Sequence, residues 1–148
     1  MDKLPHVTVT APDGTPLPLS EQSLPLVIYF YPKDDTPGCT REAQDFSALA
    51  SEFADAGVAV LGISKDSPKR HGRFIAKYDL AVPIASDESG EACEAFGTWV
   101  EKSMYGRTYM GIERATFLFD KEGRLAREWR KVKVPGHAAA VLDAARTL

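Results

Sequence analysis

The chain contains only two cysteines among its 148 residues, Cys39 and Cys93. Two thiols so far apart do not make the dense disulfide framework of a small secreted domain. Nor is there a Cys-x-x-Cys pair, because position 42 is Glu42, which argues against a thioredoxin-type dithiol exchanger. Residues 1–5 contain no apolar stretch of a secretory signal, so we expect a cytoplasmic protein in a reducing compartment.

Long apolar runs and an excess of positive charge are also missing. No segment approaches the roughly 20 apolar residues that a membrane-spanning helix requires, so we expect no membrane association. A net charge of -3 at pH 7 does not favour a nucleic-acid partner. The three histidines, His6, His71 and His137, lack the spacing of metal ligands. We therefore expect no metal or other cofactor, and we interpret these histidines as surface or cap residues.

The composition that is present indicates one globular domain. Hydrophobic residues make up 44% of the chain and charged residues 26%, as in ordinary soluble proteins. No internal repeat, low-complexity segment or linker divides the sequence, and a chain of 148 residues can bury a sizeable core. We therefore expect a single domain over residues 1–148.

The hydrophobic patterns predict strands and helices in alternation. Hairpins are expected over residues 7–19 and 116–129. Continuous apolar segments predict the buried strands 24–31, 58–63 and 82–85. Amphipathic stripes and helix-start signals predict the helices 37–54, 67–78, 87–96 and 135–148. Parallel crossovers combined with hairpins at both ends indicate an α/β fold, in which helices flank a mixed central sheet.

Cys39 follows polar and turn-forming residues, which is unusual for a packed cysteine. Thr36 suits an N-cap and Pro37 the first helical position, so Cys39 falls in the first turn of a predicted helix. Unpaired N–H groups and the helix dipole stabilise an anion there, and helix N-termini favour the thiolate form of cysteine. The alternative is a small buried apolar residue. The polar neighbours favour a reactive thiolate at the edge of a cleft.

The segment 32–39, Pro-Lys-Asp-Asp-Thr-Pro-Gly-Cys, matches the peroxiredoxin active-site pattern of Pro, three residues, Thr, two residues and Cys. The longer string YFYPKDDTPGCTREA resembles the Q-type peroxiredoxins, also called bacterioferritin comigratory proteins. Three further segments resemble the same subfamily: VAVLGISKDS, MYGRTYMGIERATFLFD and EWRKVKVPGHA. The resemblance therefore covers nearly the whole chain. It implies a thioredoxin-like (peroxiredoxin) fold with an N-terminal extension and an insertion. It also implies a thiol-dependent peroxidase that acts on hydrogen peroxide and organic hydroperoxides.

The resemblance assigns a role to each matched residue. Cys39 attacks one peroxide oxygen and becomes a sulfenic acid. Thr36 orients the peroxide, since its hydroxyl can donate and accept, and Pro32 shields the sulfur from further oxidation. Arg114 matches the active-site arginine of the family, whose guanidinium fork suits the thiolate and the departing oxygen.

Three further residues are weaker candidates. Glu42 resembles a family position that supports the site indirectly, and a solvated helix face is the alternative. Tyr105 and Arg107 are candidates for the mouth of the pocket.

The second cysteine departs from the family pattern. Many Q-type members carry a resolving cysteine five residues after the first, where this chain has Gln44, and others carry it on the following helix, where residues 67–80 contain none. Cys93 shares a helical face with Phe96, so we interpret it as core packing. A resolving role for Cys93 is the alternative.

We therefore expect a one-cysteine cycle, in which an external thiol reduces the sulfenic acid of Cys39. Thioredoxin, glutaredoxin and glutathione are the candidate reductants. A thiol-based peroxide sensor that relays its oxidation to a partner is the competing function. We expect a monomer, with a weak dimer as the alternative.

Overall fold

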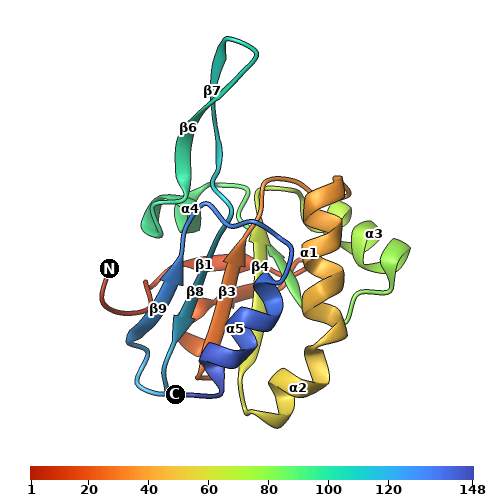
Figure 1. Cartoon of the computed structure of the whole chain (residues 1–148). Coiled ribbons are helices and arrows are strands. Elements are labelled where there is room, and N and C mark those ends of the chain that lie inside the picture. Colours follow the sequence, from red (N-terminus) through yellow and green to blue (C-terminus); the bar gives the residue numbers. More distant parts are fainter.

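Nine strands and five α-helices make up the chain, and a computed structural model describes all of residues 1–148 (Figure 1). The strands are β1 (Thr8–Thr10), β2 (Pro16–Pro18), β3 (Leu26–Phe30), β4 (Ala59–Ser64), β5 (Ile84–Ser86), β6 (Trp99–Met104), β7 (Arg107–Ile112), β8 (Ala115–Phe119) and β9 (Leu125–Trp129). The helices are α1 (Pro37–Ala48), α2 (Ala50–Asp55), α3 (Pro68–Tyr78), α4 (Glu91–Ala95) and α5 (His137–Ala145), with a 3-10 turn η1 (Leu19–Glu21). None of the helices has the length and apolarity needed to cross a membrane.

Seven of the strands form one mixed sheet in the order β2-β1-β5-β4-β3-β8-β9. The pairs β3–β4 and β4–β5 are parallel, and the remaining pairs are antiparallel. All five residues of β3 are buried, because this central strand is covered on both faces. Its antiparallel ladder with β8 ends at the rung that pairs Phe30 with Ala115. The mixed sheet and both terminal hairpins confirm the sequence prediction.

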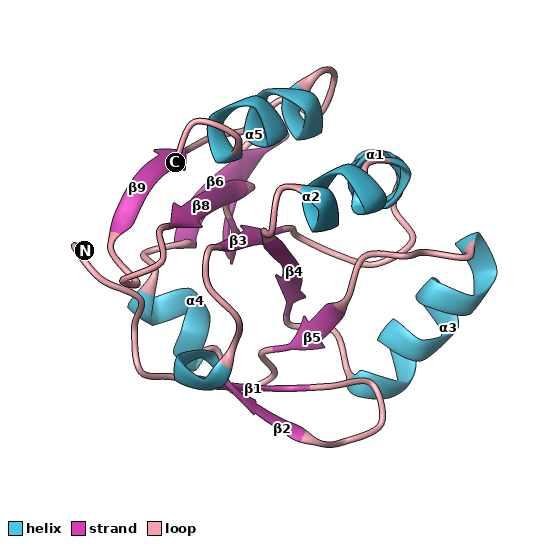
Figure 2. Ribbon diagram, turned by 90° about the horizontal axis from the view of Figure 1, so that it is seen from below, coloured by secondary structure: helices cyan, strands magenta, loops and turns pink.

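Helices α1, α2, α3 and α5 cover one face of the sheet, while α4 lies on the other (Figure 2). Successive residues of β3 alternate between these faces, so Val27 and Tyr29 point toward the four helices and Leu26 and Ile28 point away. The helix-side core is a cluster of 17 buried residues that includes Val27, Tyr29, Tyr31, Cys39 and Phe46. The far-side core is a cluster of 16 buried residues that includes Leu26, Ile28, Phe30, Cys93 and Phe96.

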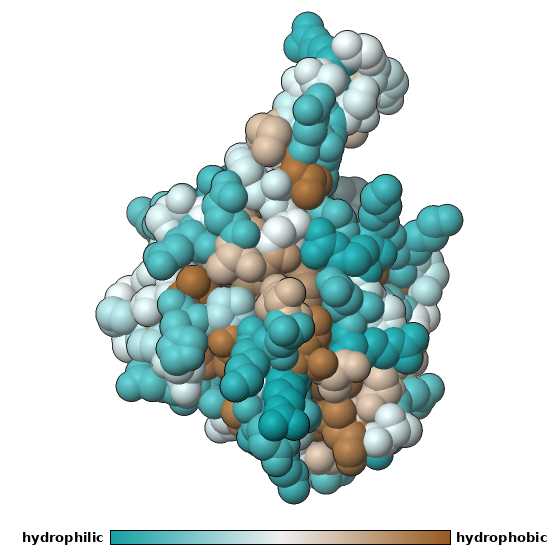
Figure 3. Space-filling model, turned by 90° about the vertical axis from the view of Figure 1, so that its left-hand side faces the viewer, coloured by the Kyte–Doolittle hydropathy of each residue, from teal (hydrophilic) through white to brown (hydrophobic).

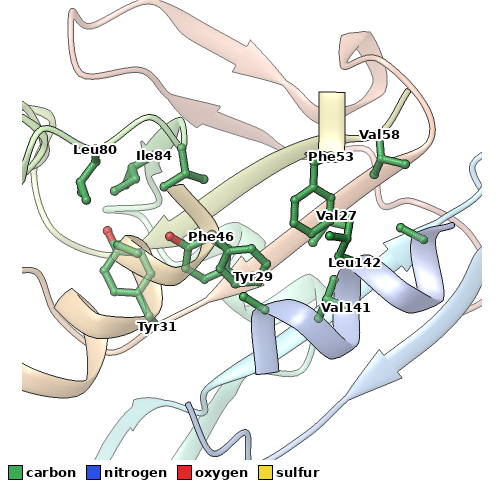
Figure 4. Packing of buried hydrophobic residues seen from close by; sticks show 14 of the residues in the cluster. Val27, Tyr29, Tyr31, Phe46, Phe53, Val58, Leu80, Ile84, Val141 and Leu142 are labelled. Atoms are coloured by element: carbon green, nitrogen blue, oxygen red, sulfur yellow. The ribbon is translucent and has the colours of Figure 1, made fainter. Parts of the chain in front are cut away.

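Aromatic rings fix α1 against the sheet in the helix-side core (Figure 4). The ring of Tyr29 stacks on that of Phe46 with centroids 4.5 Å apart and an interplanar angle of 15°. Phe53 of α2 extends this stack, with its ring centroid 6.0 Å from that of Phe46. Truncating a buried Phe of this kind costs about 3–5 kcal/mol, so this packing holds the C-terminal half of α1, together with α2, against the sheet.

The predicted helix 37–54 is broken in two at Leu49. This residue leaves helical geometry (φ -99°, ψ 6°), and its N–H bonds to the carbonyl oxygens of Phe46 and Ser47. The apolar stripe continues across the break, because Phe46 and Phe53 enter the same core. Continuity of the stripe therefore predicted one helix where the chain makes two.

The hairpin of β6 and β7 was not predicted as strands. It projects from the body as an arm (Figures 1 and 3) and forms its own two-stranded sheet. Tyr105 and Gly106 form its two-residue turn with φ of 51° and 77°, the combination of a type I′ hairpin turn. Most of its side chains are exposed, so the apolar alternation that marks a half-buried strand is missing.

Candidate active site

Cys39 lies in the first turn of α1, at the end of the segment that leaves β3. Pro37 occupies the first helical position, and Thr36 is the N-cap residue with extended backbone (φ -101°, ψ 155°). The Thr36 hydroxyl does not bond to the helix, and it donates to the carbonyl oxygen of Lys33 at 2.8 Å. The N–H groups of Gly38 and Cys39 thus stand in a first turn that lacks intrahelical acceptors. The Cys39 side chain is nearly enclosed, and the residue is 2% exposed.

Arg114 brings a guanidinium to this thiol from a distant part of the chain. It stands between β7 and β8, one residue before the rung that joins Ala115 to Phe30. Its Nη2 lies 3.4 Å from the Sγ of Cys39, and its Nη1 donates to Oε1 of Glu42 at 2.7 Å. One arginine therefore links the nucleophile to an acid one turn further along the same helix.

Gly38 makes room for this approach. A Cβ at position 38 would stand 3.2 Å from Nη2 of Arg114, closer than most real contacts of a Cβ atom. The guanidinium therefore lies against the backbone at the start of α1. Sequence reasoning did not single out Gly38, and the only signal was its place beside Cys39.

Glu42 lies on the buried face of α1, and 1% of the residue is exposed. The alternative of a solvated helix face is wrong. Burial raises the pKa of the Glu42 carboxyl to about 7, although the charge of Arg114 and its hydrogen bond favour the ionised form. Burial by itself would lower the pKa of Arg114. The negative charges of Glu42 and Cys39 and the hydrogen bonds to them have the larger combined effect, so the pKa of Arg114 is raised above its ordinary value.

The remaining candidates lie further from the thiol or toward solvent. Pro32 is exposed, so its ring is free to border an approaching molecule. Tyr105, 98% exposed, and Arg107 lie at the tip of the β6–β7 arm. Since each strand of the arm has six residues, or roughly 20 Å at 3.3 Å per residue, these two residues are not brought beside Cys39.

Lys102, at the middle of β6, was missed by the sequence analysis. It pairs across the arm with Tyr109, and its side chain packs beside Gly111, where a Cβ would stand 3.2 Å from the lysine Cδ. Burial and the nearby charge of Arg114 lower the pKa of Lys102. Lys102, in the middle of the arm, therefore adds a second cation to the surroundings of Arg114.

Cys93 occupies α4 and is fully buried in the far-side core. This burial confirms the prediction of a packed residue. Burial, reinforced by the Asp87 carboxylate, raises the pKa of the Cys93 thiol to about 12. Cys39 belongs to the helix-side core, so the sheet stands between the two thiols.

Two of the three histidines are not surface residues, which corrects the sequence interpretation. His71 is 0% exposed and His137 7% exposed. One ligand atom each from Asp34, Asp66 and His71 lies within 4.8 Å of the others, although far apart in sequence. Spacing along the chain could not reveal this cluster. Both ring nitrogens of His71 already have protein partners, Asp34 Oδ2 at 2.6 Å and the Ala85 carbonyl oxygen at 3.1 Å.

Comparisons with known proteins place these features in context. Residues 1–128 match the model of the AhpC/TSA family. The chain is 56% identical over 119 residues to Peroxiredoxin Bcp of Xanthomonas campestris pv. campestris, covering 80% of this chain and 74% of that protein. It is 45% identical over 142 residues to Peroxiredoxin Bcp of Bacillus subtilis, covering 95% and 90%.

Solved structures show the same similarity in three dimensions. A structure of the bacterioferritin comigratory protein of Xanthomonas campestris, from work on its alkyl peroxide reduction activity, has a TM-score of 0.89, with 48% identity and coverage of 95% of this chain and 90% of that one. A mutant of Xylella fastidiosa PrxQ has a TM-score of 0.92, with 40% identity and coverage of 99% and 94%. These similarities confirm the expected fold.

Proposed function

This chain belongs to the AhpC/TSA family and is a peroxiredoxin of the Q type, and from this premise we propose that it reduces hydroperoxides through Cys39 in a one-cysteine cycle. The observation that carries the proposal is the contact between Cys39 Sγ and Arg114 Nη2 at 3.4 Å, at the start of a helix. A cation and a helix N-terminus together favour the thiolate, which is the nucleophilic form of cysteine.

The first half of the cycle transfers one oxygen to sulfur. The Cys39 thiolate attacks one oxygen of the peroxide, an S–O bond forms and the O–O bond breaks. The other oxygen leaves with the electron pair and takes a proton, so that water or an alcohol is released. Negative charge moves from sulfur to oxygen during this step, and Arg114 and the N–H groups of the first turn are donors along that path.

Thr36 and Pro32 also contribute to this oxidation of Cys39. The Thr36 hydroxyl uses its hydrogen for the Lys33 carbonyl, which leaves oxygen lone pairs to accept a hydrogen from the peroxide. The exposed ring of Pro32 offers no N–H and excludes water on one side. In this way the two residues orient the peroxide and protect the sulfenic acid.

The second half of the cycle needs a thiol from outside the chain. The separation of Cys39 and Cys93 by the sheet supports this, because a disulfide requires Cα atoms within about 7 Å. The external thiol forms a mixed disulfide with Cys39 and expels water, and a second thiol then releases Cys39 in its reduced form. Thioredoxin, glutaredoxin and glutathione all have the required chemistry.

Peroxide consumption in the presence of a small dithiol tests the activity. The wild type should consume peroxide continuously, and Cys39→Ser should not. Intact-protein mass spectrometry after one equivalent of peroxide tests the cycle. We expect a gain of one oxygen at Cys39, trapped by a dimedone-type reagent, and further oxidation to the sulfinic acid with excess peroxide. A loss of two hydrogens with a Cys39–Cys93 link would instead establish a two-cysteine cycle.

A further inference from the structure

Asp34 lies in the segment between β3 and α1, and its carboxylate is buried with 2% of the residue exposed. The Tyr31 hydroxyl donates to Oδ1 at 2.6 Å, and Nδ1 of His71 lies 2.6 Å from Oδ2. The Asp34 backbone N–H donates to Oδ2 of Asp66 at 2.9 Å. Tyr31 lies at the end of the helix-side core opposite Val58 (Figure 4). Asp34 therefore ties this segment to the rest of the protein through three hydrogen-bond contacts.

His71 holds the other end of this contact and belongs to α3. Its ring is 0% exposed, and its Nε2 lies 3.1 Å from the carbonyl oxygen of Ala85 in strand β5, between β1 and β4. A carbonyl oxygen only accepts, so Nε2 carries a hydrogen. The short Nδ1–Oδ2 distance places a second hydrogen between His71 and Asp34. The imidazole therefore bridges the active-site segment to the sheet through two hydrogen bonds.

A neighbouring contact fixes the same segment to the same helix. Asp35 has a left-handed backbone with φ of 58°, and its carboxylate accepts from Nζ of Lys77 at 2.8 Å. That ion pair is exposed, so solvent screens it and it contributes little. The contact of Asp34 with His71 is buried and unscreened, which makes it the stronger of the two constraints.

A buried pair of this kind is not explained by stability alone. Burying polar side chains carries a desolvation cost that offsets much of the attraction between them. What the pair does provide is one defined geometry. It provides that geometry between Tyr31 and Thr36, two residues that flank the turn into α1 and the Cys39 thiol.

We propose that His71 is a positioning residue of the peroxidase reaction, which holds Asp34 and thereby the segment 32–36 in the geometry that presents Thr36 and Cys39 to the peroxide. This role rests on the proposed function. His71 touches neither the peroxide nor the sulfur, and it acts through Asp34.

The test compares two reactions of the same thiol. Attack on a peroxide needs the Thr36 and Arg114 geometry, whereas alkylation by a small neutral reagent needs only an accessible thiolate. We expect His71→Gln to lower the rate constant of Cys39 oxidation by peroxide about tenfold, as loss of an orienting partner does. Alkylation at the same pH should stay nearly unchanged. Val9→Ala, a truncation in the far-side core, is the control for lost stability and should leave both rates unchanged.

A second variant keeps the test decisive if His71→Gln does not fold. Asp34→Asn preserves shape, and the new amide can donate to Nδ1 of a neutral His71. Its peroxide rate should therefore fall less than that of Asp34→Ala. Proton NMR supplies an independent signature, because the hydrogen between His71 and Asp34 should resonate far downfield of ordinary amides in the wild type and in Val9→Ala. That resonance should vanish in both Asp34 variants.

Three outcomes would overturn the proposal. They are a folded His71→Gln with the wild-type peroxide rate, a parallel fall of oxidation and alkylation, and equal losses in Asp34→Asn and Asp34→Ala. Failure of the proposed function looks different, because the wild type itself would then not react with peroxide.

Discussion

Arg114 contacts Cys39 with one end of its guanidinium and Glu42 with the other, at 3.4 Å from Sγ and 2.7 Å from Oε1. Lysine carries the same charge at a single point and cannot make both contacts. The fork of Arg114 is therefore the structural basis of the first prediction.

Arg114→Lys should lower kcat/KM for peroxide about 10²-fold, comparable to the loss of one oxyanion donor. Steady-state peroxidase assays with a saturating dithiol measure this effect. Arg127→Lys is the control, since Arg127 lies over the ring of Trp129 on β9, away from the thiol. Equal activity of wild type and Arg114→Lys would show that the contact with Cys39 plays no part in catalysis.

Gly38→Ala should reduce peroxide reactivity without lowering stability. The added Cβ meets Nη2 of Arg114 at 3.2 Å and displaces the guanidinium by a few tenths of an ångström, which we expect to cost about threefold to tenfold in rate. Gly72→Ala in α3 is a matched control, because no heavy atom lies within 4 Å of its added Cβ. That control should gain about 0.5–1 kcal/mol in unfolding free energy and keep full activity. A fully active Gly38→Ala variant would contradict the prediction.

Glu42 should make stability depend on pH. Burial raises its pKa from 4.5 to about 7 in the folded state, so the folded protein holds this proton more tightly than the unfolded chain. The resulting stabilisation is complete below pH 4.5 and is lost as pH rises through 7. Its size is on the order of 3 kcal/mol, from 1.36 kcal/mol per pKa unit. Urea unfolding of wild type and Glu42→Gln at several pH values measures it.

We expect the free energy of unfolding of the wild type to fall relative to Glu42→Gln between about pH 5 and 8. The glutamine keeps an acceptor for Arg114 and does not titrate. A difference between the two proteins that stays constant over this range would exclude a proton on Glu42 as its cause.

Cys93→Ser should keep peroxidase turnover with an external thiol and lose stability. A hydroxyl is more costly to desolvate than a thiol, by up to about 1–3 kcal/mol, and Cys93 is fully buried. Denaturant unfolding and a peroxidase assay on the same preparation test both statements. If turnover disappears with every reductant while the variant stays folded, Cys93 takes part in the cycle.

The central part of the fold was predictable because its strands are continuous apolar segments. Strands β3 and β4 and the β8–β9 hairpin lie where the sequence predicts them. The β6–β7 arm was missed because solvent surrounds it and no apolar face marks its strands. Periodicity reports burial, so it cannot detect a hairpin that buries little.

The residues of the candidate site also fall into a part that the sequence could predict and a part that it could not. Cys39, Thr36 and Pro32 share one local motif, so the sequence could group them. Arg114 is 72 residues from Glu42, and His71 is 37 residues from Asp34. Only the fold brings these partners together, and a histidine in a polar helix gives no local sign that a distant carboxylate will bury it.

The pairing of Phe30 with Ala115 makes the reaction of Cys39 with peroxide depend on the register between strands β3 and β8. Ala115 points into the far-side core, so Arg114, one residue earlier, points to the face of α1. A slip of one residue between β3 and β8 would turn the guanidinium to the opposite face. Such a molecule would still be compact, but it would hold its thiol without a cation. The fraction of molecules in which Cys39 reacts rapidly with peroxide therefore equals the fraction in which β3 and β8 are paired in the correct register.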